Sequence, residues 1–278
     1  MVRLGRHVRF SINPFLDVDT PGCNSYASKP AGEGLALYLD LAVELVGPVA
    51  PETGLLVNVS EIDRAVRGFA VPVLAQQVRE CFRRGEHIPL STVAAALRLI
   101  DKHLHNKFHE ARVDRLALQL NPFRTLAMDT NEPGMMYFSE KFEFAATHKL
   151  WNEAFSEQEN FAIFGKCANP TGHGHNYTVE VTVKTPTDGP PLRIGEFERI
   201  VDTFVMEPLD HKNLNVDVTE FRERIATVEN LAIFAWERLA DRFDTGTLHC
   251  ITVWESDRTY CSYYGPAAAT AADAGAVP

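Results

Sequence analysis

Two histidines separated by one residue, His173 and His175, open a run of alternating residues that continues to Val183. On a β-strand, residues i and i+2 point to the same face, so the two imidazoles can be presented to one point in space. A second alternating segment begins at Phe138 and ends in His148. Three neutral imidazoles with an open fourth position are typical of a catalytic zinc ion. The simpler interpretation of the histidine pair is a solvated strand face.

Further side chains with reactive chemistry accompany these histidines. Cys167 lies six residues before His173. A nearby divalent cation favours the thiolate of a cysteine, which can then accept a proton near neutral pH. Asp210 and His211 are neighbours, and a histidine bonded to an aspartate is an acid–base pair. Taken alone, the same pair could cap the turn after a helix over 197–207.

Two glutamates have both a structural and a functional interpretation. Glu255 ends a predicted strand over 248–254, where it could lie in solvent or accept two parallel N–H donors. Glu229 lies at the start of a predicted amphipathic helix over 225–243, for which Thr227 is a suitable N-cap. There Glu229 could complement the helix dipole.

The stretch from about Phe138 to Gly265 resembles the 6-pyruvoyl-tetrahydropterin synthases. The matching segments are FEFAATHKL, FGKCANPTGHGHNYTVEVTV, EPLDHKNLN, TVENLA and VWES, and they occur in this order over most of the second half. The resemblance implies one zinc ion per chain, bound by His148, His173 and His175. It also implies that Cys167 is the general base, that Asp210 and His211 assist proton transfer, and that Glu255 binds the pterin, with Glu229 and Thr227 near the same pocket.

The activity implied is the conversion of 7,8-dihydroneopterin triphosphate to 6-pyruvoyl-tetrahydropterin with loss of triphosphate, as in tetrahydrobiopterin synthesis. That makes the protein a carbon–oxygen lyase, with Mg²⁺ accompanying the triphosphate. One alternative is the 6-carboxytetrahydropterin synthase of the deazaguanine pathway, although the spacing of Cys167 and the EPLDHKNLN segment favour the first activity. A homologue that binds zinc and pterin without chemistry is another alternative, against which the retained Cys167, Asp210 and His211 argue.

The first half of the chain resembles the second at an offset of 135 residues. Val59–Val66 matches Ile194–Val201, and Arg115–Leu120 matches Cys250–Glu255. We therefore predict a tandem duplication, with a degenerate copy over 1–130, a catalytic domain over 135–266 and a disordered tail over 267–278. The first copy lacks every functional residue type: the aligned positions are Pro14, Ala27, Glu33, Leu35, Ala75, Gln76, Ala94 and Leu120. His105 and His109 have helical i,i+4 spacing, which we interpret as a solvated helix face.

The fold that the resemblance implies is α+β. Each tunnelling-fold (T-fold) unit has a four-stranded antiparallel sheet with two helices on one face. The residues support this: a hairpin is predicted between Tyr177–Lys184 and Leu192–Ile194. The resemblance further implies rings of three units. Because the first copy cannot supply an aspartate–histidine pair, we expect a homotrimer, or a hexamer of two trimers, in which Asp210 and His211 serve the site of an adjacent unit.

Composition restricts partners and compartment. The 278 residues are 45% apolar and 23% charged, which suits two buried cores. A net charge of −10 argues against nucleic acid as a partner. We find no apolar run of membrane-spanning length and no signal peptide, and five scattered cysteines indicate a reducing, cytoplasmic compartment. The acidic charge requires local cations for a triphosphate; the candidates are Lys149, Lys166 and Lys212.

Overall fold

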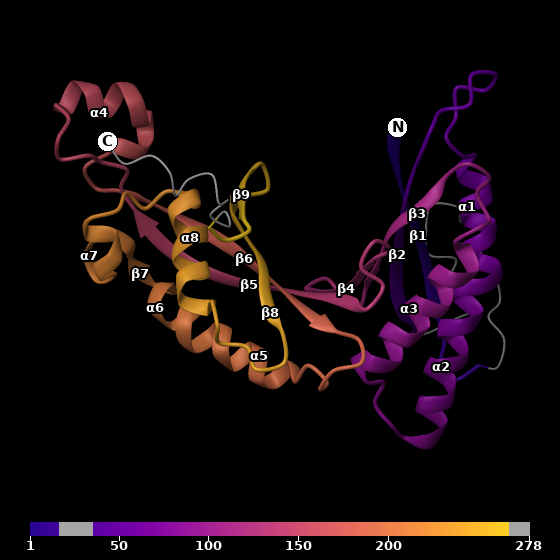
Figure 1. Ribbon diagram of the computed structural model, residues 1–278. Coiled ribbons are helices and arrows are strands. Elements are labelled where there is room, and N and C mark those ends of the chain that lie inside the picture. The colour runs from indigo at the N-terminus through magenta and orange to yellow at the C-terminus, as the bar shows by residue number, and fades with distance from the viewer. Residues whose placement is uncertain (17–35, 267–278) are drawn as a thin grey trace, which may run out of the picture. The chain divides into compact units, whose positions relative to one another are not determined.

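The computed structural model describes residues 1–16 and 36–266, and its contacts divide the chain into two compact units (Figure 1). Unit 1 comprises Met1–Glu140 with Lys184–Arg193, and unit 2 comprises Lys141–Val183 with the chain from Ile194 onward. The long strands at the centre of the sequence therefore contribute to both units. Among the described residues, no helix is long and apolar enough to cross a membrane.

Unit 1 is built on a four-stranded sheet in which every neighbouring pair is antiparallel. Its order along the sheet is the order along the chain: β1 (Val2–Ile12), β2 (Leu37–Gly47), β3 (Arg112–Gln119) and β4 (Arg124–Asp129). Between β2 and β3 come α1 (Val59–Ala65), the π-helical turn η1 (Val66–Ala70), α2 (Val71–Arg84) and α3 (Leu90–Leu104). The first three of these run on without a break.

Local signals explain where the helices of unit 1 begin and end. The Asn58 side chain accepts a hydrogen bond from the Ser60 amide and so caps α1. Gly85 ends α2 with a left-handed φ of 66°, a conformation that glycine adopts without a Cβ penalty. The buried stripe of α2 includes Leu74 and Ala75, which face the core. The helical spacing of apolar residues in the sequence therefore marks the face of α2 that is buried.

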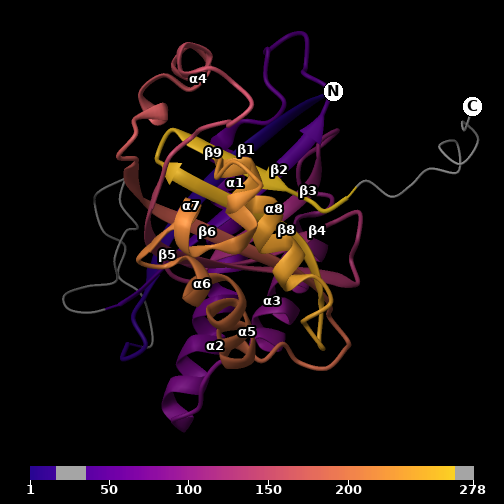
Figure 2. The same ribbon diagram turned by 90° about the vertical axis from the view of Figure 1, so that its left-hand side faces the viewer.

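Unit 2 repeats the same order of main elements around the site. Its strands are β5 (Met135–His148), β6 (His173–Pro186), β8 (Thr247–Ser256) and β9 (Thr259–Tyr263), neighbours in that order. The short β7 (Lys212–Asn213) pairs in parallel with the end of β5. Helix α8 (Val228–Leu239) packs against β8 and β9, as Figure 2 shows. The remaining helical segments are α4 (Glu157–Phe164), η2 (Gly165–Ala168), α5 (Ile194–Val201), η3 (Asp202–Met206), α6 (Glu207–Leu209), α7 (Leu214–Asp217) and η4 (Thr219–Arg222).

The expected α+β fold with an antiparallel sheet is confirmed, with strands at β5, β6 and β8 where alternation predicted them. The predicted hairpin partner Leu192–Ile194 is wrong, because Ile194 begins α5. The apolar side chains of α5 recur at helical spacing, and Phe197, Ile200 and Val201 are buried. A 3.6-residue burial period therefore overrides the turn-rich segment that suggested a returning strand.

Two helices also differ in their bounds. The helix expected over 197–207 begins at Ile194 and contains the π-helical turn η3. The helix expected over 225–243 is shorter, because the Thr227 side chain caps its start and Ala240 leaves the helical region with a ψ of 134°. The π-helical turns η1 and η3 occur at corresponding places in the two units, as a duplication predicts. Ala27, Glu33, Leu35 and the tail over 267–278 lie outside the described residues.

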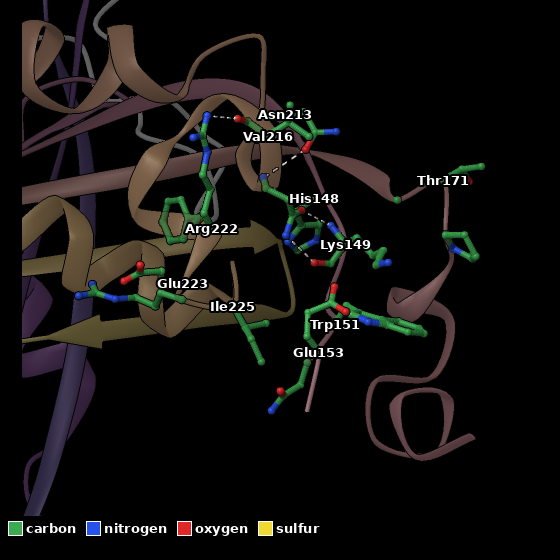
Figure 3. Close-up of a pocket in the computed structure, with 16 residues that line it drawn as sticks. His148, Lys149, Trp151, Glu153, Thr171, Asn213, Val216, Arg222, Glu223 and Ile225 are labelled. Atoms are coloured by element: carbon green, nitrogen blue, oxygen red, sulfur yellow. Dashed lines mark hydrogen bonds between the residues drawn. The ribbon is translucent and has the colours of Figure 1, made fainter. Parts of the chain in front are cut away.

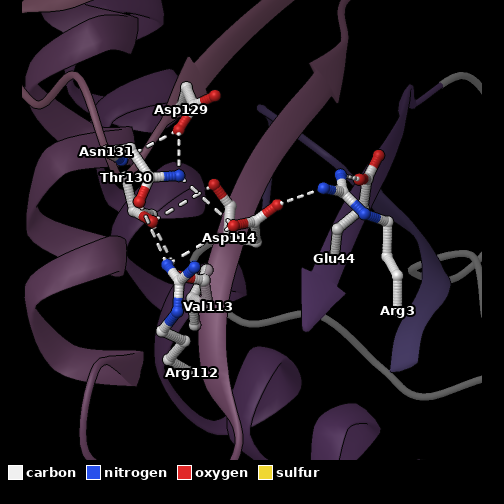
Figure 4. Close-up of polar contacts among 8 residues, drawn as sticks. All are labelled: Arg3, Glu44, Arg112, Val113, Asp114, Asp129, Thr130 and Asn131. Carbon is white, nitrogen blue, oxygen red and sulfur yellow. Dashed lines mark hydrogen bonds and ion pairs between the residues drawn. The ribbon is translucent and has the colours of Figure 1, made fainter. Parts of the chain in front are cut away.

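A polar network ties three strands of unit 1 to the turn after β4 (Figure 4). The buried carboxylate of Asp114 on β3 lies 2.8 Å from Arg3 Nη2 on β1 and 3.4 Å from Arg112 Nη1. Asn131 Nδ2 donates to it at 3.3 Å. Arg3 also bonds Glu44 on β2, at 2.8 Å. A buried carboxylate needs such partners, because an unpaired charge is expensive to bury.

We expect Asp114→Ala to lower the stability of unit 1 by about 1–3 kcal/mol, because several charge-assisted bonds are lost together. The control is Glu44→Gln, which removes one partly exposed ion pair and should cost less than about 1 kcal/mol. Hydrogen exchange of the β1–β3 amides, followed by mass spectrometry, measures both. Unchanged protection in Asp114→Ala would contradict the role given to this network.

Candidate functional site

Three imidazoles meet where β5 ends and β6 begins. Nε2 of His148 lies 3.1 Å from Nε2 of His173, and the His175 ring centroid lies 5.2 and 4.8 Å from those of the other two. Their ligand atoms all fall within 4.8 Å of one another. Two nitrogens bound to one tetrahedral zinc ion at about 2.0–2.1 Å would be about 3.3 Å apart. The observed spacing therefore suits a shared metal ion.

A hydrogen bond to a backbone carbonyl fixes the orientation of the His148 ring. Its Nδ1 donates to the backbone carbonyl of Ala226 at 2.6 Å, which leaves Nε2 as the nitrogen with a lone pair. Ala226 directly precedes Thr227, the N-cap of α8. The helix start thus fixes the tautomer of a residue almost eighty positions earlier, and directs its lone pair toward the other histidines.

Burial favours the neutral form of His148 and His173, which is the form that binds metals. Burial lowers the pKa of His148 to about 4; the bond to Ala226 acts in the opposite direction, and the neighbouring histidines lower it further. The pKa of His173 is lowered by burial and by His175. Nδ1 of His173 and Nε2 of His175 are buried without a hydrogen-bond partner. Unpartnered ring nitrogens in a three-histidine cluster fit a metal ion.

Tyr177 is a member of this cluster that the sequence interpretation missed. It follows His175 by two residues on β6, so it shares the ligand face, and its side chain is fully buried. Its hydroxyl lies 3.4 Å from His148 Nδ1, and its ring stacks on Phe144 at 4.9 Å. Its pKa is raised by burial and by the charges of Glu255 and Cys167. The alternation from His173 to His175 would have found it.

Glycine allows the two strands to meet this closely. Gly172 has a φ of 68°, and a Cβ at that position would lie 2.7 Å from the carbonyl oxygen of His148. Any larger residue would push the start of β6 away from the end of β5. The glycine before His173 therefore belongs to the architecture of the site.

Cys167 lies in η2, between α4 and β6, and is partly buried. Its carbonyl accepts a hydrogen bond from the Leu150 amide at 2.9 Å, which ties η2 to the segment after His148. Asn160 holds the segment between Leu150 and Cys167 and is fully buried. Its side-chain nitrogen contacts three backbone carbonyls, as donor, at 3.0–3.2 Å. The predicted base therefore sits on an ordered loop near the histidines.

Asp210 and His211 form the pair that the sequence suggested. The Asp210 carboxylate lies 2.8 Å from His211 Nδ1 and accepts the Ala145 amide at 3.0 Å. That backbone bond and the bond to His211 lower the pKa of Asp210. His211 adopts a left-handed φ of 56°, and its own amide donates to Ala145. The pair is thus held against β5, two to three residues before His148.

Two pockets border the histidine cluster. The first, here called the Glu255 pocket, measures about 710 Å³, and its lining includes His175, His211, Lys212 and Glu255. The second, the Lys149 pocket, measures about 560 Å³, and its lining includes His148 and Lys149 (Figure 3). The metal-ligand cluster therefore contributes to both pockets.

The other predicted substrate residues are placed differently. Lys166 is exposed on η2 and lines neither pocket. Thr227 accepts the Asn230 amide as an N-cap, and Glu229 occupies the first turn of α8. Burial, with the charge of Glu229, raises the pKa of Cys261. Thr227 and Glu229 line neither of the two pockets.

In unit 1, Ala75 and Ala94 are buried core residues, and Gln76 bonds Glu80. Among the described residues, the three histidines of unit 2 are the one group suited to a metal ion, and His105 and His109 belong to none.

Comparison with known proteins agrees with this arrangement. The family model described as 6-pyruvoyl tetrahydropterin synthase matches residues 137–266. The 6-pyruvoyl tetrahydrobiopterin synthase of Homo sapiens is 38% identical over 130 residues, which cover 46% of this chain and 90% of that protein. The protein of that name from Drosophila melanogaster is 39% identical over 134 residues, covering 47% and 80%.

Among solved structures, 6-pyruvoyl tetrahydropterin synthase of Caenorhabditis elegans matches with 32% identity and a TM-score of 0.44. The match covers 48% of this chain and 96% of that one. The residues matched by the family model, 137–266, include all three histidines of the cluster. The chain therefore belongs to the 6-pyruvoyl tetrahydropterin synthase family, with the family domain in its second half.

Proposed function

We propose that the protein is a zinc-dependent 6-pyruvoyl-tetrahydropterin synthase, a carbon–oxygen lyase that acts on 7,8-dihydroneopterin triphosphate and releases triphosphate. The observation that carries this proposal is the cluster of His148, His173 and His175, with unpartnered ring nitrogens and Cys167 close by. The relatives with that name match the unit that contains it.

The zinc ion, when bound, supplies a Lewis acid that acidifies the carbon-bound protons beside two vicinal hydroxyls. Cys167 accepts such a proton as its thiolate. His211, oriented by Asp210, moves protons at the Glu255 pocket. Glu255 accepts two parallel N–H groups from the amino edge of the pterin ring. Tyr177 keeps water from one side of the histidines, because it is fully buried and its ring contacts those of His148 and His175.

Incubating the purified protein with 7,8-dihydroneopterin triphosphate and identifying the products tests the activity. 6-Pyruvoyl-tetrahydropterin with free triphosphate is the expected result. A 6-carboxytetrahydropterin with acetaldehyde would identify the alternative reaction, and unchanged substrate would mark a protein that only binds.

The metal proposal predicts that His173→Ala purifies with far less zinc than the wild type, because one of three ligands is lost. Elemental analysis of dialysed protein measures the zinc content per chain. His105→Ala is the control, since it removes a histidine of unit 1 outside the cluster and should leave the zinc content unchanged. Undiminished zinc in His173→Ala would contradict the ligand assignment.

For the base, we expect Cys167→Ala to retain zinc and to lower kcat by about 10²–10⁴-fold, the usual contribution of a positioned acid–base group. Cys81→Ala on α2 is the matched control and should keep its turnover. Steady-state kinetics and elemental analysis on the same samples separate a lost base from a lost metal. Near wild-type kcat in Cys167→Ala would exclude this role.

We further propose that unit 1 is a structural copy without catalytic residues, and that whole chains assemble as a trimer, or as two stacked trimers. In this arrangement Asp210 and His211 complete the site of a neighbouring chain. Two facts support the first part: buried Ala75 and Ala94 occupy functional positions, and both units share one element order. The alternative to shared sites is that each chain completes its own, since His211 lines the same pocket as His175 and Glu255 of its own chain.

Mixing two inactive variants tests whether neighbouring chains share sites. Equal amounts of Cys167→Ala and His211→Ala, dissociated and reassembled together, should regain about a quarter of the wild-type activity if each site combines two chains in a ring. No regained activity would show that each chain completes its own site. The solution mass should equal three chains or six, and a monomer or dimer would contradict the assembly.

A further inference from the structure

The Lys149 pocket combines a lysine that the sequence suggested with two arginines that it did not. Its lining includes Lys149 and, from η4 and the residues after it, Arg222 and Arg224, together with the carboxylates Glu153 and Glu223. Arg224 is largely neutralised, because both of its terminal nitrogens lie 3.1–3.2 Å from the Glu237 carboxylate. Among the described residues, Lys149 and Arg222 have no ion-pair partner, so their charges remain available to a ligand.

Lys149 is held in place before any ligand binds. Its amide donates to the Asn215 side-chain oxygen at 2.7 Å, and its carbonyl accepts from the Asn215 nitrogen at 3.0 Å. Its ammonium lies 4.1 Å over the ring of Trp151, a cation–π contact. Lys149 and His148 line the same pocket, as Figure 3 shows, so this ordered charge borders the pocket that His148 enters.

Arg222 is held from another element. Its Nη2 donates to the carbonyl of Val216 at 3.1 Å, which is visible as a dashed line in Figure 3. A guanidinium carries five N–H donors, so one backbone bond fixes the side chain while most of its donors remain for a ligand. Phosphate oxygens match this planar set of donors and can accept two of them at once.

We infer that the Lys149 pocket binds the triphosphate of the substrate through Lys149 and Arg222, while the Glu255 pocket binds the pterin ring. This inference rests on the proposed function. The substrate has a ring with N–H donors at one end, hydroxyls in the middle and three phosphates at the other end. The Glu255 pocket offers a carboxylate for the ring and is bordered by His175, and the Lys149 pocket offers two unpaired cations for the phosphates and is bordered by His148. In a chain of net charge −10, these cations also attract the anion locally.

Calorimetry with two fragments of the substrate tests this division on the zinc-loaded protein. Inorganic tripolyphosphate probes the Lys149 pocket, and unphosphorylated 7,8-dihydroneopterin probes the Glu255 pocket. We expect Arg222→Gln and Lys149→Met each to weaken tripolyphosphate binding by about tenfold to a hundredfold, the loss of a charge-assisted hydrogen bond, with dihydroneopterin affinity unchanged. Glu255→Gln should instead weaken the binding of dihydroneopterin and leave the affinity for tripolyphosphate unchanged.

Arg258→Gln is the matched control, since Arg258 lies on the turn between β8 and β9 and its loss changes net charge by the same amount. Tripolyphosphate binding that is unchanged in Arg222→Gln, or equally weakened in Arg258→Gln, would overturn the inference. So would an equal loss of dihydroneopterin binding in Arg222→Gln. A wild-type protein that forms no product but shows the expected fragment preferences would refute the proposed reaction and leave the polyphosphate pocket standing.

Discussion

The site depends on the close approach of the end of β5 to the start of β6. Gly172 lets the two backbones meet, since a Cβ there would lie 2.7 Å from the His148 carbonyl oxygen. Ala226 then accepts the Nδ1 proton of His148, so that its other nitrogen faces His173 at 3.1 Å. The desolvation that lowers the histidine pKa values also keeps the imidazoles ready for a metal. The pockets and the ordered cysteine loop are arranged around this junction.

Around that junction, backbone contacts connect segments that are distant in sequence. The Asp210 carboxylate accepts the Ala145 amide, and Asn215 bonds both backbone groups of Lys149. Each contact holds a charged residue against the end of β5, where the short β7 pairs in parallel. The segment between α6 and α8 therefore acts as a support for the site, although its sequence reads as an irregular connection. Such preorganisation matters because charges fixed before binding need no reorganisation during reaction.

The two units show what a common fold requires and what chemistry adds. Both have two strands, then a helical segment with a π-helical turn, and then two more strands, although unit 2 adds α4, β7 and further short helices. Unit 1 places small apolar residues such as Ala75 and Ala94 in its core and stabilises its sheet with the ion pairs of Asp114. Unit 2 places a buried histidine, His148, among its polar groups instead. Since buried polar groups must be partnered, a metal ion would satisfy in unit 2 what salt bridges satisfy in unit 1.

The sequence alone determined the strand face of His173 and His175, the strand that ends at His148 and the helices that bury Phe197 or Leu231, because alternation and helical spacing are local patterns. Only the tertiary structure decided that Ile194 starts a helix, that Tyr177 closes the histidine cluster, and that Arg222 rather than Lys166 lines the pocket beside it. Those outcomes follow from burial and from contacts between residues tens of positions apart. No local pattern encodes such contacts, since their free energy arises only when the chain has folded.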